Sequence, residues 1–252
     1  MSLVISFTVD PSFSATIASI IDWEVFSGNQ ELSTMSKLIV IVGITGVQVR
    51  TRSHQMQYNS NKEIQGGSVA KAFVKDPSYK IRGITRDPTK PESQALIAQG
   101  IEIVKGDVED VGTLKSAFKG AHTIFGNTAF SNAMVQPTEA DLAKLKPNQT
   151  LREWCYESEV QQGKNIADAV AMVEDLKLFI WSSLSHSTKW SKGKYTGVYH
   201  FDSKAAVVEY INQMYPEVAK KMSLLQMGLF ITNWKWGQAA VPWEKVNVPN
   251  ES

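Results

Sequence analysis

The most constraining feature of this chain is a strand, turn and helix pattern that is interrupted in its middle. The segment KLIVIVGITGVQ is followed by seventeen residues without strand or helix periodicity, residues 49–65, and then by GGSVAKAF, which begins a helix. Without residues 49–65, Gly43, Gly46 and Gly66 form a G-x-x-G-x-x-G turn. Such glycines allow a tight turn, a close approach of main-chain N–H groups to a pyrophosphate, and close packing of helix on strand. The pattern predicts a dinucleotide-binding unit.

The interrupting segment can be back-translated into the signals of an intron. Val49-Arg50 can be encoded by GTA-AGN, Ser60-Asn61 by TCT-AAC and Gln65 by CAG, and the seventeen codons would keep the reading frame open. We therefore interpret residues 49–65 as a retained intron. A genuine surface insertion is the alternative, since lengthening a loop costs folding only about 1–2 kcal/mol. In either case we expect the inserted residues to let the turn and the helix start drift apart, and so to weaken nucleotide binding.

The two ends of the chain differ from its middle. Residues 1–34 contain no Lys or Arg, and their apolar run is interrupted by Asp10 and Pro11, so they have neither the pattern of a secretory signal nor that of a membrane span. We expect an extension over 1–34, one nucleotide-binding domain over 35–245 and a polar tail over 246–252. The abrupt tail predicts a truncated C-terminal lobe.

Charge and cysteine content restrict the partners and the compartment. Lys and Arg number 26 against 25 Asp and Glu, and the resulting net charge of +1 argues against direct nucleic-acid binding. The single Cys155 cannot form an internal disulfide, which favours a reducing compartment. The expected location is cytoplasmic, with a nuclear location as the alternative.

Apolar strands alternate with amphipathic helices along the rest of the chain. This alternation predicts a parallel sheet covered on both faces, an α/β doubly wound Rossmann fold. The first expected strand runs into the glycine turn within 37–46, and the others are 79–86, 101–107, 122–128, 177–185 and 222–230. The expected helices begin at Gly66 and cover 91–100, 108–120, 151–173 and 201–215, and 131–149 is expected to be a loop.

Residues at the carboxyl ends of these strands are the candidate cofactor contacts, because ligands of such sheets lie beyond that edge. Arg86 ends the second strand, where an acidic residue would hold a ribose hydroxyl and an arginine a 2′-phosphate, and Lys90 follows. We infer NADP(H) preference, with a solvated charge pair to Asp87 as the alternative. Asp107 is a candidate for the adenine amino group or for a helix N-cap. Thr128 and Phe130 are candidates for the nicotinamide side, although Phe130 could equally belong to the core.

The catalytic candidates follow the fifth strand. Short-chain dehydrogenases use a serine here and then Tyr-x-x-x-Lys, and residues four apart share one helix face. Ser183 ends the strand, but the residue four before Lys204 is His200, and Tyr199 points about 100° away. His200 could transfer protons or simply pack or form hydrogen bonds.

Six segments follow one another in this order: GITGVQ, GGSVA, TRDPTK, EIVKGDVED, FGNT and HFDSKAAVVEYI. Together they resemble the NmrA-like family of atypical short-chain dehydrogenases. The resemblance implies an NADP(H)-binding Rossmann domain. It assigns cofactor contact by position to Gly43, Thr45, Gly46, Gln48, Arg86, Lys90, Thr128, Lys204, Phe230 and Asn233.

Two functions follow from the resemblance. In the first, the chain senses NADP(H) redox state and binds a partner protein, such as a transcription factor. In the second, it is an NADPH-dependent oxidoreductase of small organic substrates, similar to isoflavone reductases, in which Lys204 acts with His200 or Ser183. The missing tyrosine favours sensing.

Overall fold

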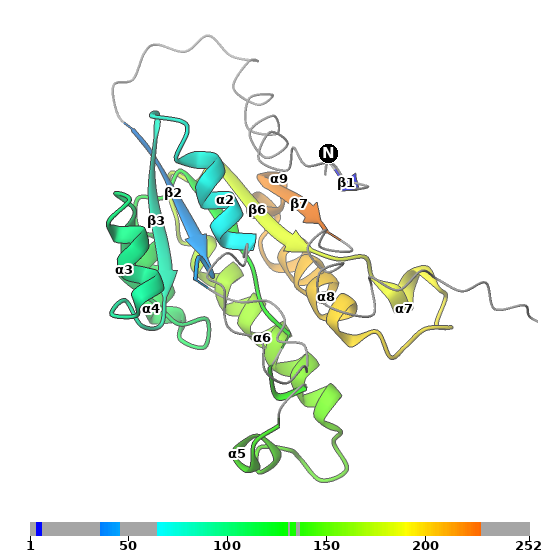
Figure 1. The fold of residues 1–252 in the computed structure, drawn as a ribbon. Coiled ribbons are helices and arrows are strands. Elements are labelled where there is room, and N and C mark those ends of the chain that lie inside the picture. Colours follow the sequence, from blue (N-terminus) through cyan, green and yellow to red (C-terminus); the bar gives the residue numbers. More distant parts are fainter. Residues whose placement is uncertain (1–3, 7–35, 46–64, 131, 135–136, 228–252) are drawn as a thin grey trace, which may run out of the picture.

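A parallel sheet forms the centre of the molecule (Figure 1). The computed structural model describes residues 4–6, 36–45, 65–130, 132–134 and 137–227. Within these residues the strand order is β1-β7-β6-β5-β2-β3-β4, and every pairing is parallel. The strands are β1 Val4–Ser6, β2 Lys37–Val42, β3 Tyr79–Thr85, β4 Glu102–Lys105, β5 Thr123–Gly126, β6 Leu178–Ser183 and β7 Met222–Gln226. The predicted doubly wound Rossmann sheet is confirmed.

Helices cover both faces of the sheet because its central strands are apolar on both. In β2, Val40 and Val42 pack toward α4, α6 and α8, whereas Ile39 and Ile41 pack toward α2. All four side chains are buried, as expected for a strand with helices on either side. The helices are α2 Gln65–Phe73, α3 Pro91–Ile97, α4 Val111–Phe118, α5 Glu139–Leu142, α6 Leu151–Val170, α7 Ser187–Trp190, α8 Tyr199–Met214 and α9 Pro216–Lys220.

Helices α6 and α8 approach each other unusually closely. A Cβ atom on Gly163 of α6 would lie 2.3 Å from Cγ2 of Val207 of α8, so only glycine fits at this position. One turn before these residues, α6 carries Glu159 and α8 carries Lys204. The close approach therefore brings a carboxylate and an ammonium group together inside the protein.

Some local predictions were wrong. The stretch 131–149 is not all loop: it contains a 3-10 turn, Asn132–Met134, and α5, which begins because Thr138 and Asp141 form a capping box. Helix α4 begins at Val111 rather than at residue 108, because the Asp110 carboxylate accepts hydrogen bonds from Gly112 N and Thr113 N. Two short helices, α7 and α9, were not predicted.

Two further differences concern segments assigned to the extension and to the insertion. Strand β1 comes from the range 1–34 and pairs with β7 at the edge of the sheet. Gln65, the last residue of the predicted insertion, is the first residue of α2. Residues 49–64, the rest of 1–34 and the tail 246–252 lie outside the described residues.

Candidate functional site

Gly43 and Gly66, the first and last glycines of the predicted turn, lie against each other although the insertion separates them in the sequence. Gly43, at the end of β2, has φ +73°, a backbone conformation that favours glycine. A Cβ on Gly66 would lie 2.6 Å from the Gly43 carbonyl oxygen and 2.9 Å from Cα of Ile44. The start of α2 therefore packs directly on the turn. Thr45 adds a contact to the next strand, since its Oγ1 lies 3.3 Å from Oγ1 of Thr85.

Gln65 links the start of α2 to β6, the strand that lies next to β5 in the sheet. Its Nε2 atom lies 2.8 Å and its Oε1 atom 3.0 Å from Oγ of Ser182, near the end of β6. Both residues are buried, with 5% of Gln65 and 4% of Ser182 exposed. Because buried polar groups without partners cost free energy, this contact holds the first turn of α2 over the carboxyl edge of the sheet.

Arg86 is exposed just beyond β3. The Asp87 carboxylate accepts hydrogen bonds from Oγ1 and N of Thr89, and these bonds, with the Lys90 charge as a smaller cause, lower the pKa of Asp87. Among the described residues Arg86 makes no ion pair, so the alternative of a charge pair with Asp87 is not what the structure shows. Lys90, like Arg86, is exposed.

Asp107 is not the N-cap of α4, contrary to one of its two interpretations. Its Oδ1 accepts a hydrogen bond from Glu109 N at 3.1 Å, and Asp110 caps the helix instead. The helix was predicted to begin at residue 108, directly after Asp107, whereas α4 begins at Val111, directly after Asp110. The adenine interpretation of Asp107 stays a prediction.

Lys204 and Glu159 form the centre of a buried polar cluster behind the end of β5. Nζ of Lys204 donates to the Thr128 carbonyl at 2.6 Å and to Thr128 Oγ1 at 3.1 Å, and it lies 3.2 Å from Oε1 of Glu159. Only 9% of the lysine side chain and 1% of the glutamate side chain are exposed. The pair thus holds the main chain of the loop that follows β5 in a fixed position relative to α6 and α8.

Three neighbouring groups complete this cluster. Thr128 Oγ1 donates to Glu159 Oε1 at 2.9 Å, the Ser203 hydroxyl donates to Glu159 Oε2, and Asn127 Oδ1 lies 3.5 Å from Nζ of Lys204. Both carboxylate oxygens of Glu159 are therefore hydrogen-bonded. A buried ion pair is tolerated when its remaining polar atoms are satisfied in this way.

His200 lies at the solvent side of this cluster. Its ring packs against Phe130, with centroids 6.1 Å apart, and against Phe201 at 4.8 Å. Although the side chain is exposed, partial desolvation lowers the pKa of the His200 imidazole; Glu159 opposes this, and the Lys204 charge adds to it. Tyr199 instead packs against Tyr156 of α6.

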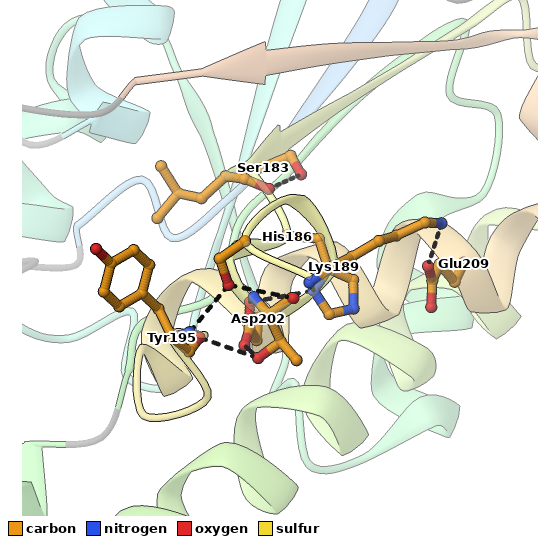
Figure 2. A network of polar contacts seen from close by, with 9 residues as sticks. Ser183, His186, Lys189, Tyr195, Asp202 and Glu209 are labelled. Carbon is orange, nitrogen blue, oxygen red and sulfur yellow. Dashed lines mark hydrogen bonds and ion pairs between the residues drawn. The ribbon is translucent and has the colours of Figure 1, made fainter. Parts of the chain in front are cut away.

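A second polar network lies beyond the end of β6, in the segment that contains α7 (Figure 2). Asp202 of α8 accepts hydrogen bonds from N and Oγ1 of Thr188 at 3.2 and 2.5 Å, and Nδ1 of His186 lies 3.2 Å from its Oδ1. The buried Ser183 hydroxyl donates to the Leu184 carbonyl, at 3.4 Å. This network anchors the α7 segment to α8.

The structure divides the predicted site residues into two groups. Gly43, Thr45 and Gly66 lie at the end of β2, while Thr128, Phe130, His200 and Lys204 lie together around the end of β5. Arg86, Lys90 and Asp107 follow β3 and β4, on the other side of the glycine turn. Gly46, Gln48, Phe230 and Asn233 lie outside the described residues.

Two residues of the site, Glu159 and Gln65, were missed by sequence reasoning. A signal for Glu159 existed, because Cys155, Glu159 and Gly163 follow each other at intervals of four on the buried face of α6. A carboxylate in the middle of such a stripe needs a buried partner. Gln65 gave no comparable signal, since it was assigned to the insertion.

Fold and site together define a Rossmann protein with a dinucleotide-type glycine turn and a buried lysine at the carboxyl edge of its sheet. The NmrA-like family model matches residues 64–242, and the chain belongs to this family.

Similar proteins include enzymes and a regulator. The NmrA-like family domain-containing oxidoreductase notA of Aspergillus sp. (strain MF297-2) is 31% identical over 150 residues, which cover 58% of this chain and 38% of that protein. The crystal structure of Nmra, a negative transcriptional regulator, has a TM-score of 0.54 at 18% identity and covers 79% of this chain and 48% of its own. A structure of Nmra in complex with NADP has a TM-score of 0.49 at 18% identity, with 72% and 43% covered. The chain thus spans less than half the length of each of these proteins.

No helix in the described part of the chain is both long and apolar enough to cross a membrane.

Proposed function

We propose that the chain carries the NADP(H)-binding site of an oxidoreductase that reduces a small organic substrate. The carrying observation is the position of Lys204, which is buried beside Thr128 and Glu159 at the carboxyl edge of the sheet, the edge beyond which ligands of such sheets lie. The name of the relative notA supports an enzyme rather than a sensor.

The residues present fit a dinucleotide. Gly66 packs so closely on Gly43 that no side chain fills the space between the turn and the first turn of α2. The first N–H groups of a helix have no intrahelical partners and bind phosphate well. The exposed Arg86, with Lys90 four residues on, would hold a 2′-phosphate, and Asp107 would accept from the adenine amino group. These residues therefore favour NADP(H) over NAD(H).

Lys204 and His200 have different roles in this proposal. NADPH supplies a hydride when bound. Lys204 donates to Thr128 and pairs with Glu159, so it holds the nicotinamide side of the site in place and contributes positive charge there. His200 is the exposed group of the cluster and the candidate proton donor, and its lowered pKa makes the imidazolium form scarce at neutral pH. Ser183 is a weaker candidate, because its buried hydroxyl is directed to a main-chain carbonyl.

A redox sensor that binds a partner protein is the second candidate function. It is favoured by the residue four positions before Lys204, where short-chain dehydrogenases have tyrosine and this chain has His200. The neighbouring Tyr199 packs on Tyr156. A sensor would bind NADP(H) without consuming it.

The test combines binding with turnover. Calorimetric titration with NADPH and NADH measures nucleotide preference, and loss of reduced-nicotinamide absorbance is followed with a panel of ketones, enones, imines and quinones. Substrate-dependent oxidation of NADPH supports the oxidoreductase. Tight binding with no oxidation across the panel supports the sensor, and no binding of either nucleotide contradicts both.

A further inference from the structure

The residue directly before Gly66 is a glutamine whether or not the insertion is present. In this chain that residue is Gln65, and if residues 49–65 are removed it becomes Gln48. The local sequence Gln-Gly-Gly-Ser-Val-Ala is the same in both cases. In the sequence, the insertion therefore separates Gln48 from Gly66 and puts Gln65 directly before it.

The described contacts show what the residue in this position does. Gln65 is the first residue of α2, is 5% exposed, and contacts Ser182 Oγ through both atoms of its carboxamide, at 2.8 and 3.0 Å. Its neighbour Gly66 packs on the carbonyl of Gly43. The start of α2 is thus held at two points, one on β6 and one on the turn after β2.

We propose that Gln65 has taken the place that Gln48 holds in the sequence without residues 49–65, and that it positions the first turn of α2 for the nucleotide. The proposal rests on the nucleotide site proposed above. It also changes the expected effect of the insertion. The sequence alone suggests that the two halves of the site drift apart, whereas the contacts of Gln65 and Gly66 keep the helix start against the turn.

A consequence is that the intact chain binds the nucleotide. A flexible loop weakens binding when binding itself must order the chain. Here the helix start is ordered by contacts within the protein. The entropic cost of closing the loop is therefore part of the free energy of folding and does not reduce the free energy of binding. We expect the Kd for NADPH of the intact chain to lie within about tenfold of that of the variant lacking residues 49–65.

The test uses both chains and two measurements. In the intact chain, Gln65→Ala, Ser182→Ala and the double variant form one double-mutant cycle, and Gln48→Ala with Ser182→Ala forms a second. In the chain without residues 49–65, Gln48→Ala takes the place of Gln65→Ala. Thermal midpoints without ligand report the contact itself, and calorimetric Kd values for NADPH report its effect on the nucleotide. Gln57→Ala, inside the insertion, is the control for the intact chain.

In the intact chain we expect Gln65→Ala to lower the midpoint, to be coupled to Ser182→Ala, and to weaken NADPH binding about tenfold, the scale of one hydrogen bond. In the shortened chain we expect Gln48→Ala to show the same coupling. Coupling of Gln48 to Ser182 in the intact chain, or its absence for Gln65, would overturn the proposal. So would an intact chain that binds NADPH a thousandfold more weakly than the shortened one. If neither chain binds NADPH, the proposed function fails, and the midpoints still decide which glutamine contacts Ser182.

Discussion

Glu159 of α6 and Lys204 of α8 form an ion pair, with 3.2 Å between Oε1 and Nζ, that is almost completely shielded from water. The pair exists because Gly163 and Val207, one turn further along, let the two helices approach closely. It lies directly behind Thr128, whose carbonyl accepts a hydrogen bond from the lysine. Packing between two helices thus determines the position of a loop at the carboxyl edge of the sheet.

The first prediction concerns the loss of this carboxylate. Glu159→Ala leaves the Lys204 charge buried without its counter-ion and should lower the free energy of unfolding by about 3–5 kcal/mol. Urea unfolding measures the change. Glu157→Ala is the matched control, since it removes an exposed ion pair with Lys146 from the same helix and should have little effect. Equal effects of the two substitutions would show that the buried pair does not stabilise the fold.

Arg86 should determine nucleotide preference. Arg86→Ala removes a guanidinium that is exposed and has no ion pair among the described residues, so its loss should cost about 1.5–3 kcal/mol of NADP binding and leave NAD binding nearly unchanged. Calorimetry with both nucleotides measures this. Lys80→Ala removes an exposed cation near the start of β3, the strand that precedes Arg86, and is the control. A parent protein with equal affinity for NAD and NADP would contradict the prediction.

His200 should be needed for turnover but not for binding. If it donates the proton, His200→Ala should lower substrate-dependent NADPH oxidation by about a hundredfold or more, the scale of general acid catalysis. Because the pKa of His200 is lowered, the rate should fall as the pH rises through that pKa, which lies below the ordinary value of 6.5. Unchanged oxidation in the variant would remove His200 from the mechanism.

Stability should decrease in mild acid because of His122. Burial, with the charges of Lys37 and Lys177 as smaller causes, lowers the pKa of this imidazole from its ordinary value of 6.5. The unfolded chain therefore takes up a proton at a higher pH than the folded chain. Stability from this group is complete above about pH 6.5 and decreases as the pH falls toward the folded-state pKa.

The check is urea unfolding of the parent and of His122→Gln between neutral pH and pH 5. In the His122→Gln variant the unfolding free energy should depend less on pH than in the parent. The His200→Ala variant measures how much of the pH dependence comes from His200, the other histidine whose pKa is lowered. A parent whose stability rises as the pH falls through this range would show that the sign is wrong.

The sequence by itself determined the type and order of the main elements. A strand such as KLIVIV is apolar at consecutive positions, which suits only burial on both faces, and alternation with amphipathic helices leaves little choice but a parallel doubly wound sheet. These signals are local, since each depends on residues within one element. The starts of the helices were predicted less accurately. Several polar residues near the start of α4 could act as its N-cap, and only the structure shows that Asp110 does.

Only the tertiary structure decided which polar groups meet. Glu159 lies 45 positions before Lys204, and Gln65 lies 117 residues from Ser182, so no local pattern pairs them. Their contacts arise when β5, β6, α2, α6 and α8 pack around one edge of the sheet, and the steric fit of Gly163 and Gly66 determines how closely they approach. The sequence therefore predicted the strands whose carboxyl ends form this edge, whereas the polar partners that gather there were determined by long-range packing, which brings together side chains that are far apart along the chain.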